Sequence, residues 1–498
     1  MKIRLLLLLW ITASAVFAQS EKKENKPSIS WPAPVSTNHT IKISGQTINY
    51  SATAGHQEQF NDKGEKIADL FYVAYRRDGQ DAGKRPITFC FNGGPGSSSV
   101  WLHMGAIGPK RLPMTADGES VKPPYGLLDN EYTWLEQTDL VFIDPVETGY
   151  SRPAEGTDKK EFTGYGEDLR SVGDFIYKYT SLNNRWASPK FLAGESYGTT
   201  RAAGLAGYLQ DRHGMYLNGI VLVSAVLNFQ TISSASGNDL PYPLYLPSFA
   251  ATAWYHGKLD KNKYASLQSV LADAEGFALG EYSSALLKGD RLTEAEKASL
   301  SARMQALLGL SDSFLRQHLF RITTSKFTKE LLRTQGETLG RFDGTIKGLD
   351  RQDAGDSYEY DPSYNRSIFG GYTMAINHHL RNTLQYPYPD QVYEILTGKV
   401  QPWNYGEATN RYLDNSGVLA AAIHKNPALQ VLICNGYYDL ATPYFATQYT
   451  LDHMFVRGEL RQNLQMKYYE GGHMMYSRER DLSTFTKDVK AFYKQVLH

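Results

Sequence analysis

The segment GESYG, residues 194–198, carries the clearest chemical signal in this chain. It matches G-x-S-x-G, the tight turn between a strand and a helix that exposes a serine nucleophile. The flanks agree, because residues 190–193 form a short apolar run and residues 199–210 repeat apolar side chains at helical spacing. A chance match in a chain with 43 glycines is the alternative. We predict that Ser196 is a nucleophile and that the following helix N-terminus stabilises negative charge in front of it.

Two later loops hold side chains that could activate this serine. A serine hydroxyl needs a base to take its proton and an acid to orient that base, and this turn occurs with the chain order serine, acid, histidine. Residues 431–434 predict a strand followed by Asp439, and residues 464–469 predict a strand followed by a glycine pair and His473. Because ligands bind at the carboxyl ends of strands in open α/β sheets, we predict Asp439 as the acid and His473 as the base.

A glycine-rich loop precedes all three residues. Residues 92–99, NGGPGSSS, follow the apolar run 87–91. Backbone without side chains that turns sharply after a strand can aim an amide at a developing oxyanion. Alone, this loop is more typical of an ordinary glycine turn. Together with the serine turn and the histidine loop, it favours an oxyanion hole.

The elements that must position these loops form an α/β pattern. Residues 40–51 and 66–76 alternate in polarity and predict antiparallel strands. Continuous apolar runs then alternate with helical patterns, which indicates a mostly parallel central sheet covered by helices on both faces. The predicted parallel strands are residues 87–91, 140–143, 190–193, 220–226, 431–434 and 466–469, and the predicted helices are residues 164–179, 199–211, 443–455 and 481–497.

Residues 236–400 interrupt this alternation. Residues 261–287, 293–308 and 312–319 predict helices, and the sequence TEAE that begins at Thr293 is typical of a capping box. We predict an inserted, mainly helical cap over the nucleophile, between two parts of a hydrolase core at residues 39–235 and 401–498. A separate accessory domain with no role in the site is the alternative.

The first residues predict a targeting signal. Basic residues precede an apolar run at residues 5–10, and the sequence VFA at residues 16–18 is typical of secretory cleavage. We predict a signal peptide of residues 1–18 and a flexible N-terminal arm of residues 19–38. No later stretch reaches the roughly 18 apolar residues of a membrane helix. The expected protein is therefore exported and not inserted into a membrane.

Cysteine content and charge exclude other classes. Cys90 and Cys434 each lie in an apolar run, which favours buried thiols over a disulfide or a metal pair. An exported protein of this length without a disulfide framework is typical of a bacterial envelope, either periplasmic or secreted. Lys and Arg total 52 and Asp and Glu total 52, so no net field attracts nucleic acid. We predict no cofactor and no metal, and the oligomeric state stays open.

Together these motifs resemble the serine carboxypeptidase family. The motifs occur in the family's order and span about residues 86–476. They are NGGPGSSS at 92–99, DPVETGYS at 144–151, GESYG at 194–198, the Asp439 loop and GGHM at 471–474. The resemblance implies an α/β-hydrolase fold with a helical cap, peptide C-termini as substrates, and a triad of Ser196, Asp439 and His473.

The resemblance also implies the binding groups around the triad. Oxyanion donors would be the backbone amides of Gly94 and Tyr197. The peptide's C-terminal carboxylate would be held by Asn92, the amide of Gly93 and Glu195, and Met474 would contact substrate beside the histidine. A protonated Glu195 donates a hydrogen bond to that carboxylate, whereas an ionised one repels it. A glutamate that points to solvent is the alternative.

Three positions depart from the family. Ala106 stands where the family usually has a second glutamate, so we expect the pH behaviour of the clamp to depend on Glu195 alone. Glu195 should then lose its proton at lower pH than a glutamate pair does, with burial opposing this shift. Ser97 and Thr442 replace family cysteines. The first replacement fits the absence of bridges, and the second is expected to change the pocket for the departing residue.

These features predict an exported serine hydrolase that removes residues from peptide C-termini through an acyl-enzyme. An esterase or acyltransferase on the same scaffold is the alternative within enzymes, and the alanine at position 106 makes it more plausible. A catalytically silent hydrolase fold used for binding is the alternative outside enzymes.

Overall fold

The computed structural model describes residues 30–498, and Trp31–His498 form one compact unit. The predicted signal peptide and residues 19–29 of the predicted arm lie outside the described residues. Within residues 30–498, no helix combines the length and the apolar character needed to cross a membrane.

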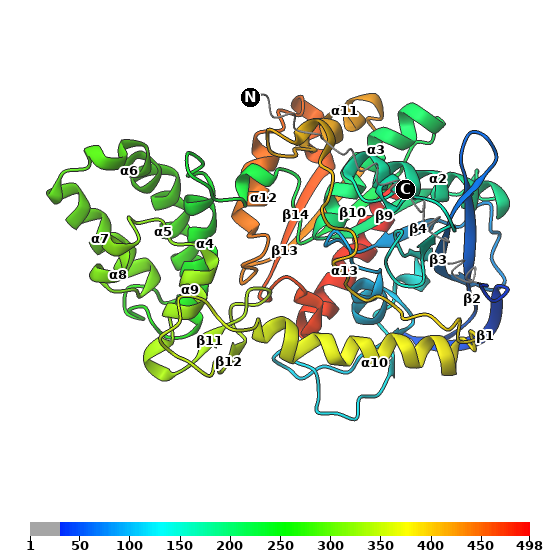
Figure 1. Cartoon of the computed structure of the whole chain (residues 1–498), viewed down its shortest axis with the longest axis horizontal. Helices are drawn as coiled ribbons and strands as arrows, with labels where there is room; N and C mark the ends of the chain where they lie inside the picture. Colours follow the sequence, from blue (N-terminus) through cyan, green and yellow to red (C-terminus); the bar gives the residue numbers. More distant parts are fainter. Residues whose placement is uncertain (1–29) are drawn as a thin grey trace, which may run out of the picture. The chain divides into compact units, whose positions relative to one another are not determined.

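A large mixed sheet forms the centre of this unit (Figure 1). Its strand order is β1-β2-β3-β7-β4-β9-β10-β13-β14, with β8 paired to β3. The pairs from β1 to β7 are antiparallel, whereas the strands from β7 to β14 in this order run parallel to one another. The bounds are β1 Val35–Ile43, β2 Gln46–Phe60, β3 Lys66–Arg77, β4 Ile87–Phe91, β7 Asp139–Ile143, β8 Arg152–Pro153, β9 Lys190–Glu195, β10 Gly219–Val223, β13 Gln430–Gly436 and β14 Leu464–Tyr469.

Every side chain of β4, β7, β9 and β10 is buried. Because successive side chains of a strand point to opposite faces, both faces of the sheet are covered at these strands. In β4, Phe89 and Phe91 belong to one apolar cluster and Cys90 belongs to another. Helices α2, α3 and α11 cover the first face, and α10 and α13 cover the second. This arrangement confirms the predicted α/β class, and Cys90 and Cys434 are buried free thiols as predicted. The helix bounds are α2 Tyr165–Leu182, α3 Tyr197–His213, α10 Gly370–His378, α11 Ser416–Lys425 and α13 Glu479–Leu497.

The N-terminal strands differ from the prediction in two places. The single strand predicted at residues 40–51 is wrong, because a turn at Ser44 and Gly45 separates β1 from β2. These turn residues have φ of 50° and 81°, which suits the twist of a tight hairpin. The predicted arm also extends too far, because residues 35–38 are already held in β1 by pairing with β2.

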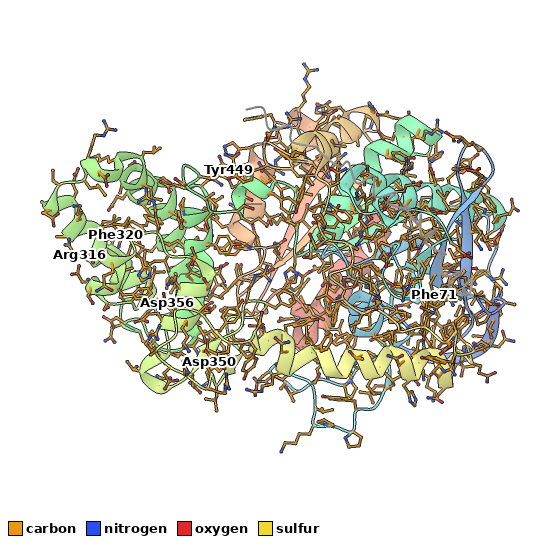
Figure 2. All side chains as sticks on the ribbon, viewed as in Figure 1. Phe71, Arg316, Phe320, Asp350, Asp356 and Tyr449 are labelled. Atoms are coloured by element: carbon orange, nitrogen blue, oxygen red, sulfur yellow. The ribbon has the colours of Figure 1, made fainter. Side chains whose placement is uncertain are left out.

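The long segment between β10 and β13 contains the predicted cap, and its first half builds a helical lobe with its own apolar cluster (Figure 1). Phe320 belongs to this cluster, and Arg316 lies on the same lobe (Figure 2). The predicted capping box is confirmed, since Thr293 and Glu296 each accept a hydrogen bond from the other's backbone amide. The helix predicted at residues 261–287 begins later, at Leu267, where Ser266 caps it. The lobe's helices are α4 Pro241–Tyr255, α5 Leu267–Phe277, α6 Ser283–Lys288, α7 Glu294–Leu308, α8 Asp312–Gln317 and α9 Thr324–Glu330.

The second half of the predicted cap packs on the core instead. Ile368, Tyr372 and Leu380, on or beside α10, join the same apolar cluster as Cys90. Asp350, labelled in Figure 2, forms a buried 2.6 Å ion pair with Lys329 and ties the connecting stretch to the lobe. The prediction of a single cap over residues 236–400 is therefore wrong, because the apolar side of α10 is buried against the sheet.

Candidate active site

The GESYG turn joins β9 to α3, and Ser196 stands between them with φ 59° and ψ −130°. This left-handed backbone is strained for a serine and is typical of a nucleophile turn. A Cβ on Gly194 would lie 2.2 Å from the carbonyl oxygen of Gly198, and a Cβ on Gly198 would lie 2.9 Å from that of Phe91. The turn can therefore close only with glycine at both positions.

Asp439 and His473 form a buried pair beyond the ends of β13 and β14. His473 Nδ1 lies 2.8 Å from Asp439 Oδ2, and the side chains are 3% and 0% exposed. Asp439 Oδ1 accepts hydrogen bonds from the backbone amides of Ala441 and Thr442. Burial lowers the pKa of His473, but the Asp439 carboxylate outweighs it, so the pKa lies above its ordinary value.

Close backbone packing brings His473 to this place. A Cβ on Gly436 would lie 2.3 Å from carbonyl oxygens of the glycine pair 471–472, so β13 can end directly against the histidine loop. The His473 amide donates to the Phe342 carbonyl at 2.5 Å, and Ser224 Oγ donates to the His473 carbonyl at 2.6 Å. These contacts hold the loop from both sides.

Thr442 supports the same pair. Its hydroxyl lies 2.8 Å from Asp439 Oδ2 and 3.2 Å from His473 Nδ1. Thr442 is 4% exposed and is not among the residues that line the cavity described below. The expectation that it shapes the pocket for the departing residue is wrong, because its hydroxyl turns toward the Asp439 carboxylate.

The glycine-rich loop after β4 lies directly on the start of α3. A Cβ on Gly93 would lie 2.4 Å from the amide nitrogen of Tyr197. Asp144 Oδ1 accepts 2.9 Å hydrogen bonds from the amide and the hydroxyl of Ser99, which fastens the far end of the loop. Within residues 30–498, the amides of Gly94 and Tyr197 donate no hydrogen bond. Both amides could therefore stabilise an oxyanion beside the serine.

Arg201 fastens the near end of this loop to α3. Its Nη1 donates to the Asn92 carbonyl at 2.6 Å, and its Nε donates to Asp168 Oδ2 at 2.8 Å. The guanidinium lies 5.3 Å from the ring centroids of both Phe91 and Tyr197. The buried ion pair thus sets the spacing between the loop and the helix that carries the serine. The only signal of this role in the sequence is that Arg201 stands among small residues in the first turns of the helix.

A cavity of about 240 Å³ opens where these elements meet. Ser196 and His473 both line it, while Asp439 lies behind His473 and contributes no surface. The Tyr197 side chain is buried with Val400 and Trp403, so only its amide is relevant to the cavity. The predicted substrate-binding residues Asn92, Gly93, Glu195 and Met474 line the cavity, as does Gly94 of the predicted oxyanion hole.

Residues that the sequence pattern did not reveal form the rest of the wall. The ring of Phe342 stacks on His473, with centroids 4.8 Å apart. Tyr364 packs edge-on against both Phe342 and Trp101, and Arg341 lies over the Phe342 ring. This side of the cavity is therefore largely aromatic. In the described part of the chain, no group of three His, Cys, Asp or Glu side chains could hold a metal ion.

Glu195 ends β9 and is 2% exposed, which excludes the alternative of a glutamate that points to solvent. Burial raises the pKa of its carboxyl to about 7, although His473 and a hydrogen bond from Tyr476 act to lower it. The Tyr476 hydroxyl donates to Glu195 Oε2. Asn92 Nδ2, on the same cavity, makes no hydrogen bond within the described residues. A neutral carboxyl and an unsatisfied amide offer donors to an anionic group.

Comparison with known proteins agrees with this geometry. The sequence model of the serine carboxypeptidase family matches residues 44–491. This chain belongs to the serine carboxypeptidase family. The predicted α/β-hydrolase fold is confirmed, because the parallel sheet, the strand-to-helix turn and the loop order are those of that fold.

Curated relatives match parts of the chain. Serine carboxypeptidase-like 35 of Arabidopsis thaliana is 26% identical over 252 residues, covering 46% of this chain and 48% of that protein. Serine carboxypeptidase-like 29 of the same organism is 31% identical over 163 residues, covering 31% of each. Carboxypeptidase Y homolog A of Emericella nidulans is 26% identical over 235 residues, covering 45% of this chain and 37% of that protein. The matched part spans less than half the length of these relatives.

One departure from the family has a visible structural counterpart. Ala106, where the family usually has a second glutamate, is fully buried and carries no group that could meet Glu195. The Tyr476 hydroxyl meets Glu195 instead. The expectation that the pH behaviour of the clamp depends on Glu195 alone stays a prediction, since Tyr476 adds a hydrogen-bond donor but no second acid. The only available signal for Tyr476 was its position three residues after the predicted base.

Proposed function

We propose that this chain is a serine carboxypeptidase, which removes C-terminal residues from peptides through an acyl-enzyme on Ser196. One observation carries the proposal, namely that Ser196 and His473 share a small cavity with buried Glu195 and Asn92. A nucleophile beside a carboxylate-binding surface selects the last peptide bond, because the substrate's terminal carboxylate must reach that surface.

Acylation uses the Asp439–His473 pair. His473 Nε2 takes the hydroxyl proton while Ser196 Oγ attacks the scissile carbonyl carbon, and the carbonyl electron pair moves to oxygen. The amides of Gly94 and Tyr197 stabilise the negative oxygen. Asp439 holds Nδ1–H and stabilises the imidazolium. The C–N bond then breaks, and His473 gives its proton to the departing amine.

Deacylation repeats these steps with water. His473 takes a proton from a water molecule whose oxygen attacks the acyl carbon, and the same amides stabilise the second tetrahedral intermediate. The bond to Ser196 Oγ breaks, and His473 returns the proton to that oxygen. The shortened peptide leaves as a free carboxylic acid.

Glu195 and Asn92 recognise the end of the substrate. Because the pKa of Glu195 lies at about 7, its carboxyl carries a proton below that pH and donates a hydrogen bond to the peptide carboxylate. Above that pH the ionised group repels the carboxylate. Preference for a free acid over an amide should therefore be present below about pH 7 and be lost above it.

Fluorophosphonate labelling and a peptide pool test this function. We expect the probe to modify Ser196 in the wild type and to leave Ser196→Ala unlabelled, with peptide turnover reduced on the order of 10⁴-fold or more. Mass spectrometry of a mixed pool should show products shortened only at the C-terminus, with amidated peptides spared at acidic pH. Substantial turnover by a folded Ser196→Ala variant would mean that another residue is the nucleophile.

An esterase or acyltransferase is the second candidate, because Ala106 leaves the clamp without the family's second acid. Such an enzyme would turn over small activated esters but would not distinguish free-acid from amidated peptides at any pH. A silent binding protein would fail to react with the fluorophosphonate. The two assays above therefore separate all three functions.

We also propose export to a bacterial periplasm or to the medium, on the basis of residues 1–18 and the absence of a disulfide between the two buried thiols. N-terminal sequencing of protein recovered from the envelope fraction should begin at Gln19. Recovery of the unprocessed chain from cytoplasm would contradict this proposal.

A further inference from the structure

Tyr476 lies on a short turn directly after the histidine loop, in the 3₁₀ segment Met475–Ser477. Its ring is 1% exposed, and its hydroxyl donates to Glu195 Oε2. The Asn92 amide is a second neighbour that acts to lower the pKa of Glu195, so Tyr476 and Asn92 both face this carboxyl. One carboxyl oxygen of the clamp is therefore occupied by a group from a distant part of the sequence.

Small residues on the opposite wall leave room for phenol rings. A Cβ on Gly105 would lie 2.4 Å from Tyr372 Oη and 2.6 Å from Tyr476 Cε2. The next residue, Ala106, extends only a methyl group and is fully buried. Gly105 thus leaves space for both phenol rings, directly before the position where the family usually has a second acid.

The two tyrosines differ in one respect that matters. Tyr476 Oη is bonded to Glu195, whereas the buried Tyr372 Oη has no hydrogen-bond partner within the described residues. Both rings belong to the same apolar cluster. The site therefore contains a matched pair of buried phenols, one engaged with the clamp and one not.

We propose that Tyr476 is a positioning residue for Glu195, and that its hydroxyl takes Oε2 so that the acidic proton is carried by Oε1 and offered to the substrate's carboxylate. This inference rests on the proposed carboxypeptidase function. A carboxyl whose second oxygen already accepts a hydrogen bond has one favoured protonation site. Tyr476 thereby takes the place of the family's second acid without adding a charge.

The other groups around Glu195 also affect the pKa of its carboxyl, so they must be considered before the effect of a change at Tyr476 is predicted. His473 acts to lower the pKa of Glu195 and Asp439 acts to raise it, while Tyr372 is an uncharged neighbour. Arg111 lies further out and acts on Tyr372. A donor to a carboxylate stabilises the ionised form, so removal of the Tyr476 hydroxyl should raise the pKa of Glu195.

Tyr476→Phe and its control Tyr372→Phe test this role directly. Isotope-edited infrared difference spectra, with Glu195→Gln as the blank, follow protonation of the Glu195 carboxyl across pH without any substrate. We expect Tyr476→Phe to raise the midpoint by about one pH unit, and Tyr372→Phe to leave it unchanged. Equal midpoints in the wild type and Tyr476→Phe would overturn the proposal.

Kinetics supply the second readout. We expect Tyr476→Phe to raise KM for free-acid peptides about tenfold at acidic pH, because Oε1 is no longer fixed, while kcat for a small activated ester stays close to that of the wild type. Tyr372→Phe should change neither value. A Tyr476→Phe variant with unchanged KM and unchanged pH profile would show that the tyrosine only packs.

The two readouts separate failure of this inference from failure of the proposed function. If no peptide is cleaved by the wild type but the infrared midpoint still responds only to Tyr476→Phe, the function is wrong and the positioning role stands. If peptides are cleaved and the midpoint does not respond, the positioning role is wrong. Should Tyr476→Phe fail to fold, site-specific 3-fluorotyrosine at position 476 strengthens the donor and is expected to lower the midpoint. An unchanged midpoint there would also overturn the proposal.

Discussion

Asp439 and Glu195 are two buried carboxyl groups of one site, and their surroundings differ in the number of donors. Asp439 accepts from the amides of Ala441 and Thr442, and its other oxygen faces His473 and the Thr442 hydroxyl. Glu195 accepts from the single hydroxyl of Tyr476. Several hydrogen bonds hold the Asp439 oxygens in place, whereas burial raises the pKa of Glu195.

This difference assigns different chemistry to residues with the same functional group. The Asp439 loop turns back on itself, so its own backbone supplies the donors. Glu195 sits at the end of a strand whose backbone amides are used in the sheet, so it must find a donor on another element. Burial alone, 0% and 2% for the two residues, does not distinguish them.

The largest expected effect comes from removing the charge of Asp439, the carboxyl that faces several hydrogen-bond donors. Asp439→Asn should lower kcat on the order of 10⁴-fold, because an amide facing His473 Nδ1 favours the wrong tautomer of the base. Ester and peptide substrates should be affected alike, as measured by steady-state kinetics at pH 7 with circular dichroism as the folding control. A loss of less than tenfold would mean that another acid orients His473.

The Glu195 carboxyl should affect how the free energy of unfolding depends on pH. The pKa of Glu195 rises from 4.5 to about 7 in the folded chain, so its contribution to stability is complete below pH 4.5 and is lost as pH rises through about 7. Glu195→Gln removes this loss and should raise the free energy of unfolding by about 3 kcal/mol at pH 8, with little change at pH 4. Urea titrations at both pH values measure this. An equal effect at pH 4 and pH 8 would rule out a neutral Glu195.

Removing a single donor from the Asp439 side should have a smaller effect. Thr442→Val keeps the shape of the side chain but removes the hydroxyl that lies 2.8 Å from Asp439 Oδ2. We expect kcat to fall about tenfold with KM nearly unchanged, because the backbone donors remain. Thr442→Ser, which keeps the hydroxyl, is the matched control. If Thr442→Ser loses as much activity as Thr442→Val, packing of the methyl group and not the hydrogen bond is responsible.

The smallest effect is expected at the aromatic wall, which touches His473 but neither carboxyl. Phe342→Leu should lower kcat/KM for peptides about fivefold and leave hydrolysis of a small activated ester within about twofold, because the ring bounds the space beside the histidine and takes no part in proton transfer. A panel of peptides with different terminal residues measures the change in preference. Equal losses of kcat/KM on peptides and esters would mean that the ring acts by holding His473 in position.

Much of the site could be predicted because its chemistry is encoded in short segments. The GESYG turn, the Asp439 loop and the histidine loop each combine a functional residue with the local glycines that its backbone needs, and each follows a run of apolar residues. Local patterns of this kind are visible in a few residues. The hairpin at Ser44 and Gly45 also has a local signal, because the apolar alternation changes phase between Ile43 and Ile48, but the prediction of one strand over residues 40–51 missed it.

The insertion shows where local patterns fail. Helical periodicity at residues 236–400 indicates that each helix has an apolar side to bury. It does not indicate which part of the protein that side packs against. The lobe from α4 to α9 buries its apolar sides in a cluster of its own, and α10 buries its apolar side against the sheet. Both halves have the same periodicity, so only their packing separates them.

The sequence by itself determined the fold class, the order of the strands that carry the predicted triad and the identity of half of the cavity residues, because each depends on a pattern within about ten positions. Only the tertiary structure decided the partners of those residues. Phe342 meets His473, and Tyr476 meets Glu195 across 281 positions of the chain. Contacts between such distant segments depend on how helices and loops pack on the sheet, and that packing decides which buried carboxyl is neutral.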